Sequence, residues 1–190
     1  MSPTTILRIL DHGVMRDMAA GLTNLERRQV VEYLTKTDLS TYKGPPPVKM
    51  CDAHHKLFDL TEPPPHVGWG YENRRFVPVE TGGLTAVDLP RLKLKWAFAF
   101  PDATQARSQP VVAMGAVFVG SHDGSVFALD LATGCARWTS TANSEVRTAV
   151  LVEPWEGGRP PKNPKLFFGD VLGYVYGVDA LTGKQLWQVK

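Results

Sequence analysis

Residues 117–138 read VFVGSHDGSVFALDLATGCARW, and residues 166–187 read LFFGDVLGYVYGVDALTGKQLW. The two segments align without a gap at a spacing of 49 residues, and eight columns are identical. Most other columns exchange one apolar residue for another, or one turn residue for another. A tandem repeat with a period near fifty and short β-rich units is typical of propeller blades. Because two blades cannot close a ring, we expect the 190 residues to form an incomplete β-propeller.

Each repeat predicts a hairpin, followed by a second turn and a third strand. In the first repeat the pair Asp123-Gly124 is a hairpin signal, because glycine tolerates the positive φ that such a turn requires. Asp130 and Gly134 then form the second turn, in which a carboxylate accepts hydrogen bonds from backbone amides two or three residues further on. We therefore assign Asp130, and its counterpart Asp179 in the second repeat, to turns and not to catalysis.

The bulk composition is that of an ordinary globular protein, with 43% hydrophobic and 21% charged residues. The net charge of +2 is too small to build a phosphate-neutralising surface, so we expect no nucleic-acid partner. No apolar stretch approaches the roughly 20 residues of a membrane span, and the N-terminal MSPTTILRIL lacks the features of a secretion signal. Taken alone, the chain is expected to be cytosolic and soluble, without a signal peptide. Two cysteines exclude a Cys-rich metal cluster, and no C-x-x-C-H is present for covalent haem attachment.

The first 37 residues predict two helices joined by a turn. Ser2 followed by Pro3 is a typical N-cap and first helical position. Thr23 and Glu26 form a capping-box pattern, and the apolar residues at helical spacing after it predict a helix that runs to about Thr35.

Composition divides the rest of the chain into two segments. Residues 38–66 contain two runs of three prolines and no sustained period, which is typical of a linker. Residues 67–190 hold the repeats. Within them, LKLKWAFAF at 92–100 alternates charged and apolar residues, which predicts a strand with one exposed and one buried face. Trp96 lies 42 residues before Trp138 and is expected to close an earlier, partly visible blade.

The pattern Asp-x-x-Thr-Gly-x-x-x-Trp occurs at 130–138 and again at 179–187. It resembles the tryptophan-docking repeat of the pyrroloquinoline quinone (PQQ) dehydrogenase propellers, and it differs from a WD repeat, which ends in Trp-Asp. Residues 68–78 and the segment GLTAVDLPRLKLKWAFAFP at 83–101 resemble the part that leads into the propeller of quinohaemoproteins of the polyvinyl-alcohol-dehydrogenase type. In that family a cytochrome c domain precedes the propeller, and residues 6–34 are similar to the closing half of such a domain.

This resemblance implies a mainly β fold, with the first two to three blades of a PQQ-type β-propeller after a short α-helical cytochrome-c-like remnant. Residues 1–37 would then be the C-terminal part of the cytochrome-like domain. The implied parent is a periplasmic or secreted alcohol dehydrogenase that uses PQQ with Ca²⁺ and haem c, a small or polymeric alcohol, and an electron-acceptor cytochrome. Because the haem-attachment motif and further blades are absent from these 190 residues, we expect a truncated portion that is inactive alone and binds none of these cofactors.

The resemblance also implies which residues serve the cofactors. Met15 lies where the axial methionine of the haem lies in the family. Arg147 begins the innermost strand of the second blade, where its guanidinium would pair with a carboxylate of PQQ. Thr148 would add a hydroxyl contact, and Gln109 at the corresponding strand of the preceding blade is a weaker candidate. The alternative for Arg147 is a structural salt bridge or an exposed loop end. No catalytic residue and no metal ligand is assigned.

The resemblance further implies that Cys51 and Cys135 form a disulfide in an oxidising compartment, which would tie the linker to the rim of the propeller. Buried free thiols are the alternative. His54 and His55 have no partners at metal-ligand spacing, so we expect no metal site there. His122 lies in a hairpin turn and is predicted to be solvated.

Two other classes of function remain open. The same tryptophan repeat occurs in scaffolding proteins of outer-membrane assembly, so the chain could be part of a non-catalytic interaction propeller. The cytochrome-like helical pair argues against this reading, because a scaffold has no use for it. A free-standing small binding protein is a third possibility, and it would require the two blades to pair with copies of themselves.

Overall fold

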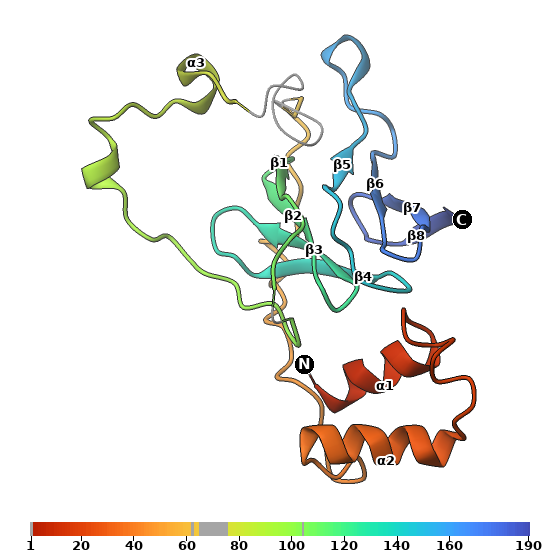
Figure 1. Cartoon of the computed structure of the whole chain (residues 1–190). Coiled ribbons are helices and arrows are strands. Elements are labelled where there is room, and N and C mark those ends of the chain that lie inside the picture. Colours follow the sequence, from red (N-terminus) through yellow and green to blue (C-terminus); the bar gives the residue numbers. More distant parts are fainter. Residues whose placement is uncertain (1, 62, 65–75, 104) are drawn as a thin grey trace.

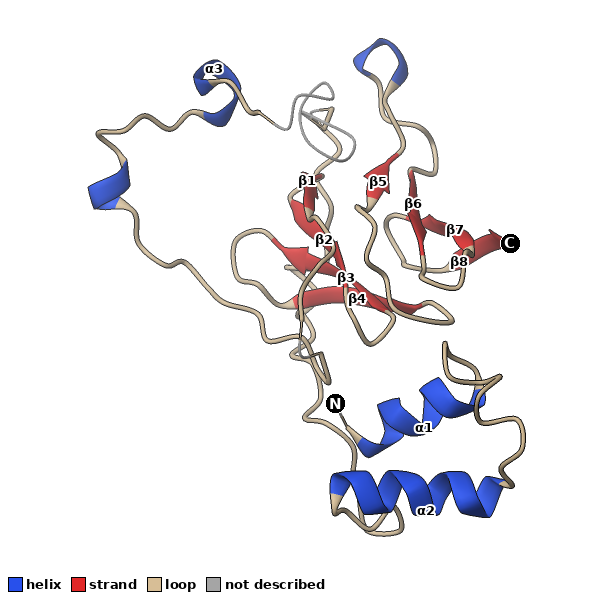
Figure 2. Cartoon of the chain, viewed as in Figure 1, coloured by secondary structure: helices blue, strands red, loops and turns tan. Residues whose placement is uncertain are grey.

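The computed structural model describes residues 2–61, 63–64, 76–103 and 105–190 (Figure 1). Two four-stranded antiparallel sheets lie side by side, and each is built from one sequence repeat. Most of the regular structure in the described ranges is strand (Figure 2), so the predicted mainly β fold of a partial propeller is confirmed. The segment from 68 to 75 that contributed to the family resemblance, and the expected boundary at 66, lie outside the described residues.

The first sheet has the strand order β1-β2-β3-β4. Its strands are β1 (Val111–Ala113), β2 (Ala116–Gly120), β3 (Ser125–Asp130) and β4 (Ala136–Thr141). The predicted hairpin joins β2 to β3, and Gly124 in its turn has φ +92. Nearly every residue of β2 and β3 is at least partly buried, because both faces of this sheet are covered. The β3–β4 pairing is interrupted by a bulge between Ala128 and Leu129.

The second sheet repeats this design with the strand order β5-β6-β7-β8. Its strands are β5 (Leu151–Val152), β6 (Lys165–Gly169), β7 (Val175–Asp179) and β8 (Gln185–Val189). A bulge lies between Gly177 and Val178, at the position that corresponds to the bulge in the first sheet. The innermost strand is shorter than expected, because only one bridge, between Val146 and Asp170, precedes β5. The prediction that Arg147 begins this strand is therefore wrong, since Arg147 lies between that bridge and β5.

The N-terminal residues form the two predicted helices. The helices α1 (Pro3–Asp11) and α2 (Asn24–Thr35) pack against each other (Figure 1). The hydroxyl of Ser2 caps α1, and the reciprocal capping box of Thr23 and Glu26 begins α2. The guanidinium of Arg8 donates to the carbonyls of Asp123 and Asn143, which ties α1 to turns beside the first sheet. Three short helical turns complete the structure: α3 (Val79–Gly82), η1 (Leu89–Arg91) and η2 (Glu156–Gly158).

The proline-rich segment after the helices lies along the edge of the first sheet. The backbone N–H of Ala136 in β4 donates to the Lys49 carbonyl at 2.9 Å, and the N–H of Cys51 donates to the Ala136 carbonyl at 2.8 Å. A disulfide joins Cys51 to Cys135 beside this pairing. Further along, the ring of Phe58 lies parallel to that of Phe118, with centroids 6.1 Å apart. These contacts hold the segment against the sheet.

The prediction of a strand at 92–100 is wrong. These residues pair with no neighbouring strand in the described part of the chain, and Leu94 is 85% exposed. Alternation of polar and apolar residues reports which face of an extended chain is buried, but it does not supply the hydrogen-bonded neighbour that makes a strand. Trp96 in this segment nevertheless packs on the first sheet, where its indole N–H donates to the Leu131 carbonyl at 3.1 Å.

Tryptophan rings join each unit to the next. The ring of Trp138 lies against Gly183, and its indole N–H donates to the Ala180 carbonyl of the second sheet at 2.9 Å. Trp96 makes the corresponding contact with Gly134. At both glycines a Cβ atom would lie within 2.6 Å of the ring, so a side chain there is incompatible with this packing. Glycine is therefore required at these turns for the approach of the ring and for its positive φ.

The buried ion pair of the first sheet connects its second turn to β4. Asp130 Oδ1 accepts hydrogen bonds from the amides of Ala132 and Thr133 at 3.1 and 2.8 Å, which confirms its assignment as a turn cap. Its Oδ2 accepts a hydrogen bond from Arg137 at 2.7 Å. The same guanidinium also donates to the carbonyls of Met114 and Gly115, so both charges are compensated inside the sheet.

Comparison of alanine variants at Gly183 and Gly173 should distinguish the energetic cost of a clash with the tryptophan ring from the cost of a positive φ. Gly183→Ala imposes φ +71 on alanine and also places a Cβ 2.5 Å from the ring of Trp138. Gly173→Ala imposes a similar φ of +83 in open space and is the matched control. We expect a loss of about 1 kcal/mol from the backbone in both variants, and roughly 1–3 kcal/mol more in Gly183→Ala from the clash. Urea unfolding measures both, and equal midpoints would contradict the packing contact.

Removal of the disulfide should destabilise the chain. Cys51 and Cys135 are 84 residues apart, and closing a loop of that length is worth about 4 kcal/mol in the chain-entropy model. The double variant Cys51→Ser/Cys135→Ser should therefore lower the free energy of unfolding, measured by urea denaturation, by an amount that approaches this value. An intact mass that does not change on reduction of the wild type, or a variant as stable as the wild type, would count against the bridge.

The Asp130–Arg137 pair should make stability depend on pH. Burial alone raises the pKa of Asp130, but hydrogen bonds from Arg137 and Thr133 outweigh it and lower the pKa from 3.8 to about 2. Because the folded pKa is the lower one, this contribution is fully present above the unfolded pKa and is lost as the pH falls through the folded value. In Asp130→Asn the free energy of unfolding should therefore fall less steeply as the pH is lowered through this range.

The second repeat provides the control for that measurement. Asp179 occupies the same turn position as Asp130, but Leu186 stands where the first repeat has its arginine. Asp179→Asn should therefore change the pH profile less than Asp130→Asn does. If the free energy of unfolding depended on pH with the same slope in wild type and Asp130→Asn, the buried pair would not control stability in acid.

Candidate functional site

The candidate site lies where the chain enters the second sheet. The first strands of the two sheets, β1 and β5, are in contact (Figure 1). The N–H of Val146 donates to the Ser121 carbonyl in the β2–β3 turn at 3.0 Å. The carbonyl of Glu145 accepts a hydrogen bond from Val171 in the β6–β7 turn at 3.1 Å. The segment that precedes β5 is thus held between hairpin turns of both sheets.

Three charged or titratable side chains meet at this place, and we call them the hinge cluster: His122, Glu145 and Arg147. Oε2 of Glu145 lies 3.0 Å from Nε2 of His122 and forms an ion pair with Nη2 of Arg147. The same Nη2 lies 3.2 Å from Nε2 of His122. The side chains of His122 and Glu145 are each only 10% exposed, whereas that of Arg147 is 42% exposed. A buried carboxylate therefore faces a half-exposed arginine.

The prediction that His122 is solvated is wrong. Its hairpin turn is covered by the segment that carries Glu145 and Arg147. A turn at the edge of one sheet is exposed only if no neighbouring chain crosses it, and the repeat pattern of a single sheet does not contain that information.

Arg147 was expected either to pair with a carboxylate of PQQ or to form a structural salt bridge, and the structure shows a salt bridge. It makes a structural ion pair with Glu145, as the alternative interpretation expected. Among the residues that the structure describes, its Nε and Nη1 atoms have no hydrogen-bond partner. A guanidinium has five N–H donors in a planar fork, so one edge of Arg147 is held while donors on the rest of the fork stay available to an anion.

Thr148 and Gln109 are brought near each other through a serine that sequence reasoning missed. The buried hydroxyl of Ser108 donates to the Thr148 carbonyl at 2.7 Å and accepts from the Gly120 amide at 3.1 Å. The Thr148 hydroxyl donates to the Gly169 carbonyl at 3.1 Å and accepts from its amide at 3.0 Å. That hydroxyl is therefore committed to the backbone, whereas half-buried Gln109 makes no hydrogen bond within the described ranges.

The other predicted cofactor residue lies in the helical part. Met15 is in the turns between α1 and α2, where its side chain is 39% exposed and its carbonyl accepts a hydrogen bond from Ala19. The hinge cluster instead lies between the two sheets, so the structure places Met15 and Arg147 in different parts of the fold.

The described residues gather no set of three His, Cys, Asp or Glu side chains that could hold a metal ion. The ring of His55 hydrogen-bonds Asp52 at 2.9 Å and meets the ring of His54 edge to face. The two histidines thus contact Asp52 and each other. Within the described part of the chain, no helix is both long enough and apolar enough to cross a membrane.

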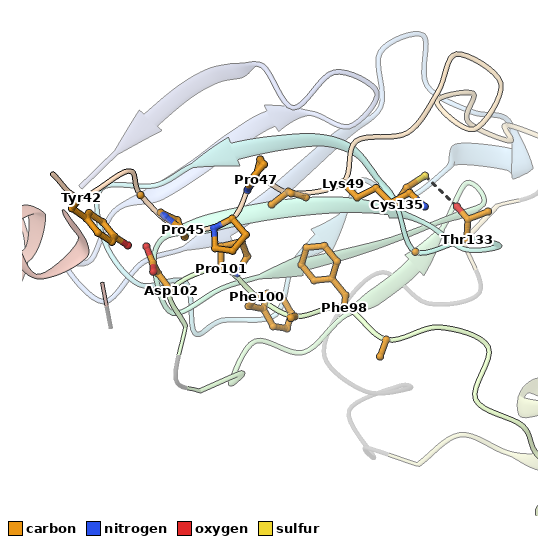
Figure 3. A pocket seen from close by; sticks show the side chains of 16 residues that line it. Tyr42, Pro45, Pro47, Lys49, Phe98, Phe100, Pro101, Asp102, Thr133 and Cys135 are labelled. Carbon is orange, nitrogen blue, oxygen red and sulfur yellow. Dashed lines mark hydrogen bonds between the residues drawn. The ribbon is translucent and has the colours of Figure 1, made fainter. Parts of the chain in front are cut away.

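A groove of about 830 Å³ lies between the proline-rich segment and the first sheet (Figure 3). Its walls are formed mainly by apolar residues, among them Pro45, Pro47, Phe98, Phe100 and Pro101. Asp102 at one end accepts hydrogen bonds from the hydroxyls of Ser2 and Thr5, at 2.6 and 3.2 Å. The groove offers an apolar surface and no group arranged for proton transfer.

Comparison with known proteins identifies the family. A family model described as "Outer membrane protein assembly factor BamB" (PQQ_2) matches residues 58–190. The chain is 36% identical to a polyvinylalcohol dehydrogenase from Pseudomonas sp over 98% of its length, and 33% identical to one from Sphingopyxis sp. (strain 113P3) over 96%. It spans only 31% and 30% of those two relatives.

A solved structure supports the fold. The quinohemoprotein alcohol dehydrogenase from Comamonas testosteroni aligns with 73% of this chain and 21% of its own, with a TM-score of 0.51 and 23% identity. At that identity the likeness concerns the arrangement of the sheets alone. From the family match and the two repeated sheets together, the chain belongs to the PQQ-type propeller family, with polyvinylalcohol dehydrogenases among its relatives.

Proposed function

We propose that these residues form part of the cofactor-binding propeller of a PQQ-dependent alcohol dehydrogenase that acts on small or polymeric alcohols. The observation that carries the proposal is the half-exposed guanidinium of Arg147, which lies in the segment that leads into the inner strand β5 of the second sheet. Relatives named polyvinylalcohol dehydrogenase match nearly the whole chain, including most of the helical segment. That coverage favours a dehydrogenase over a scaffold, to which the helical pair would add nothing.

The residues at the hinge cluster fit a quinone that carries carboxylates. Arg147 has free donors on a planar cation, which is the geometry that pairs with a carboxylate in two parallel hydrogen bonds. The amide of Gln109 could add a neutral contact, whereas the hydroxyl of Thr148 is engaged by Gly169 and is the weakest of the three assignments. When bound, PQQ supplies the electron-accepting chemistry for oxidation of the alcohol.

The fit is poorer for the other cofactors of such an enzyme. The described residues supply no cluster of carboxylates for Ca²⁺, so we derive no step through that ion from this part of the chain. We propose Met15 as the thioether ligand of haem c in the whole protein, supported by its partly exposed side chain in the helical segment. Transfer of electrons to a cytochrome partner belongs to the same proposal.

We further propose that the 190 residues do not complete a catalytic site by themselves. The chain spans about a third of the length of the dehydrogenases it matches. Its second sheet leaves Trp187 42% exposed, whereas the equivalent Trp138 is 6% exposed between the two sheets. The disulfide between Cys51 and Cys135 supports a periplasmic or secreted location, because disulfides persist in oxidising compartments.

A fusion protein tests the cofactor assignment. Residues 1–190 would replace the matching 31% of the Pseudomonas polyvinylalcohol dehydrogenase, and PQQ affinity would be measured by quenching of tryptophan fluorescence. Arg147→Ala should weaken PQQ binding by about tenfold or more, because a hydrogen bond to a charged group is worth roughly 1.5–3 kcal/mol. The PQQ affinity of Arg147→Lys should lie between those of the wild-type fusion and Arg147→Ala, because lysine keeps the positive charge and lacks the planar pair of N–H donors.

The control is Arg159→Ala, which removes the same charge from an exposed position between β5 and β6 and should leave the affinity unchanged. Unchanged affinity in a correctly folded Arg147→Ala fusion would eliminate the assignment. A fusion that folds and binds no PQQ at all would favour the scaffold function, which the description of the matched family model also allows.

A further inference from the structure

A buried carboxylate organises the surroundings of Arg147. Glu145 is held by its own backbone to the β6–β7 turn through Val171, and its neighbour Val146 is held to the β2–β3 turn through Ser121. Both hydrogen bonds have ordinary lengths, 3.1 and 3.0 Å. The Glu145 side chain therefore extends from a backbone that is anchored to both sheets, and its position is defined before it contacts the arginine.

His122 supports the same carboxylate oxygen from the other sheet. Its Nε2 lies 3.0 Å from Oε2 of Glu145 and 3.2 Å from Nη2 of Arg147. The other carboxylates near this turn are engaged elsewhere. Asp123 accepts hydrogen bonds from Ser125 in its own turn. In the β6–β7 turn, the Asp170 carboxylate accepts hydrogen bonds from the hydroxyl of Tyr176 and from backbone amides.

We propose that Glu145 and His122 are positioning residues that hold one edge of the Arg147 guanidinium, so that its remaining donors are pre-arranged for a carboxylate ligand. This inference rests on the proposed role of Arg147 in binding PQQ. A long, half-exposed arginine loses considerable rotamer freedom when it binds a ligand. An arginine that is already held in place by Glu145 loses less, and the ligand binds more tightly for that reason.

The sign of one substitution separates positioning from simple electrostatics. Glu145 carries a negative charge close to the place where a carboxylate ligand would pair with Arg147, and like charges repel. If the charge of Glu145 were all that mattered, Glu145→Gln would tighten the binding of an anion. If Glu145 positions the guanidinium, the same variant weakens binding, because a neutral amide holds an arginine less firmly than a carboxylate does.

The holding of Arg147 can be observed in the 190-residue chain itself, without any cofactor. In nitrogen-15 spectra the side-chain N–H signals of Arg147, assigned by their loss in Arg147→Lys, should be resolved in the wild type. They should broaden or average in Glu145→Gln, and to a smaller extent in His122→Asn. Glu153→Gln is the matched control, because Glu153 pairs with Lys165 elsewhere in the second sheet. Identical Arg147 signals in wild type and Glu145→Gln would overturn the positioning role.

The consequence for the ligand is measured as PQQ affinity in the same fusion protein. We expect Glu145→Gln to weaken PQQ binding by about tenfold, as for loss of one interaction between charged groups, and Glu153→Gln to leave it unchanged. Tighter or unchanged binding in Glu145→Gln, while Arg147→Ala still weakens binding, would overturn this inference and leave the proposed function intact. Unchanged binding in Arg147→Ala would defeat the proposed function, and with it the ligand that this inference assigns to the held guanidinium.

Discussion

The contact between a tryptophan ring and a glycine of the next sheet is the interaction on which the arrangement of this structure depends. Trp138 lies against Gly183 and donates its indole N–H to the Ala180 carbonyl. This contact restricts the sequence, because the turn that packs against the indole ring must have a residue without a Cβ atom at the point of contact. Trp96 satisfies the same requirement on the first sheet, although it comes from a segment that forms no strand. The contact of Trp138 thereby places the second sheet relative to the first, and that of Trp96 fixes the segment at 92–100 on the first sheet.

The hinge cluster is a consequence of that placement. Once the sheets are docked through Trp138, the chain that leads into the second sheet must cross the hairpin turn of the first. The backbone hydrogen bonds of Glu145 and Val146 to turns of the two sheets are formed at this crossing. His122 is buried by the crossing chain, and it becomes part of the environment of Arg147. Burial of the Glu145 carboxylate would be costly without a neighbouring positive charge, and the guanidinium of Arg147 supplies it. The docking of the two sheets therefore produces both the packing around His122 and the ion pair of Glu145 with Arg147.

Much of this fold could be predicted from the repeat and from short local patterns. The hairpin at Gly124, the turn capped by Asp130 and the capping box at Thr23 are all local, since a few neighbouring residues determine each of them. The strand at 92–100 was predicted wrongly, because an alternating pattern does not show whether a partner strand is present. The burial of His122 was missed for a related reason: it depends on a segment more than twenty residues away.

The two repeats show how far burial depends on neighbours. Trp138 and Trp187 occupy the same column of the repeat, yet they are 6% and 42% exposed, because the first sheet has a neighbour on that side and the second has none among the residues that the structure describes. In stacked repeats stability comes from each unit together with its contacts to adjacent units. The same reasoning applies to the candidate site. His122 belongs to the first repeat and Arg147 follows it, so neither sheet contains the cluster alone, and its charge balance arises only when the two sheets meet.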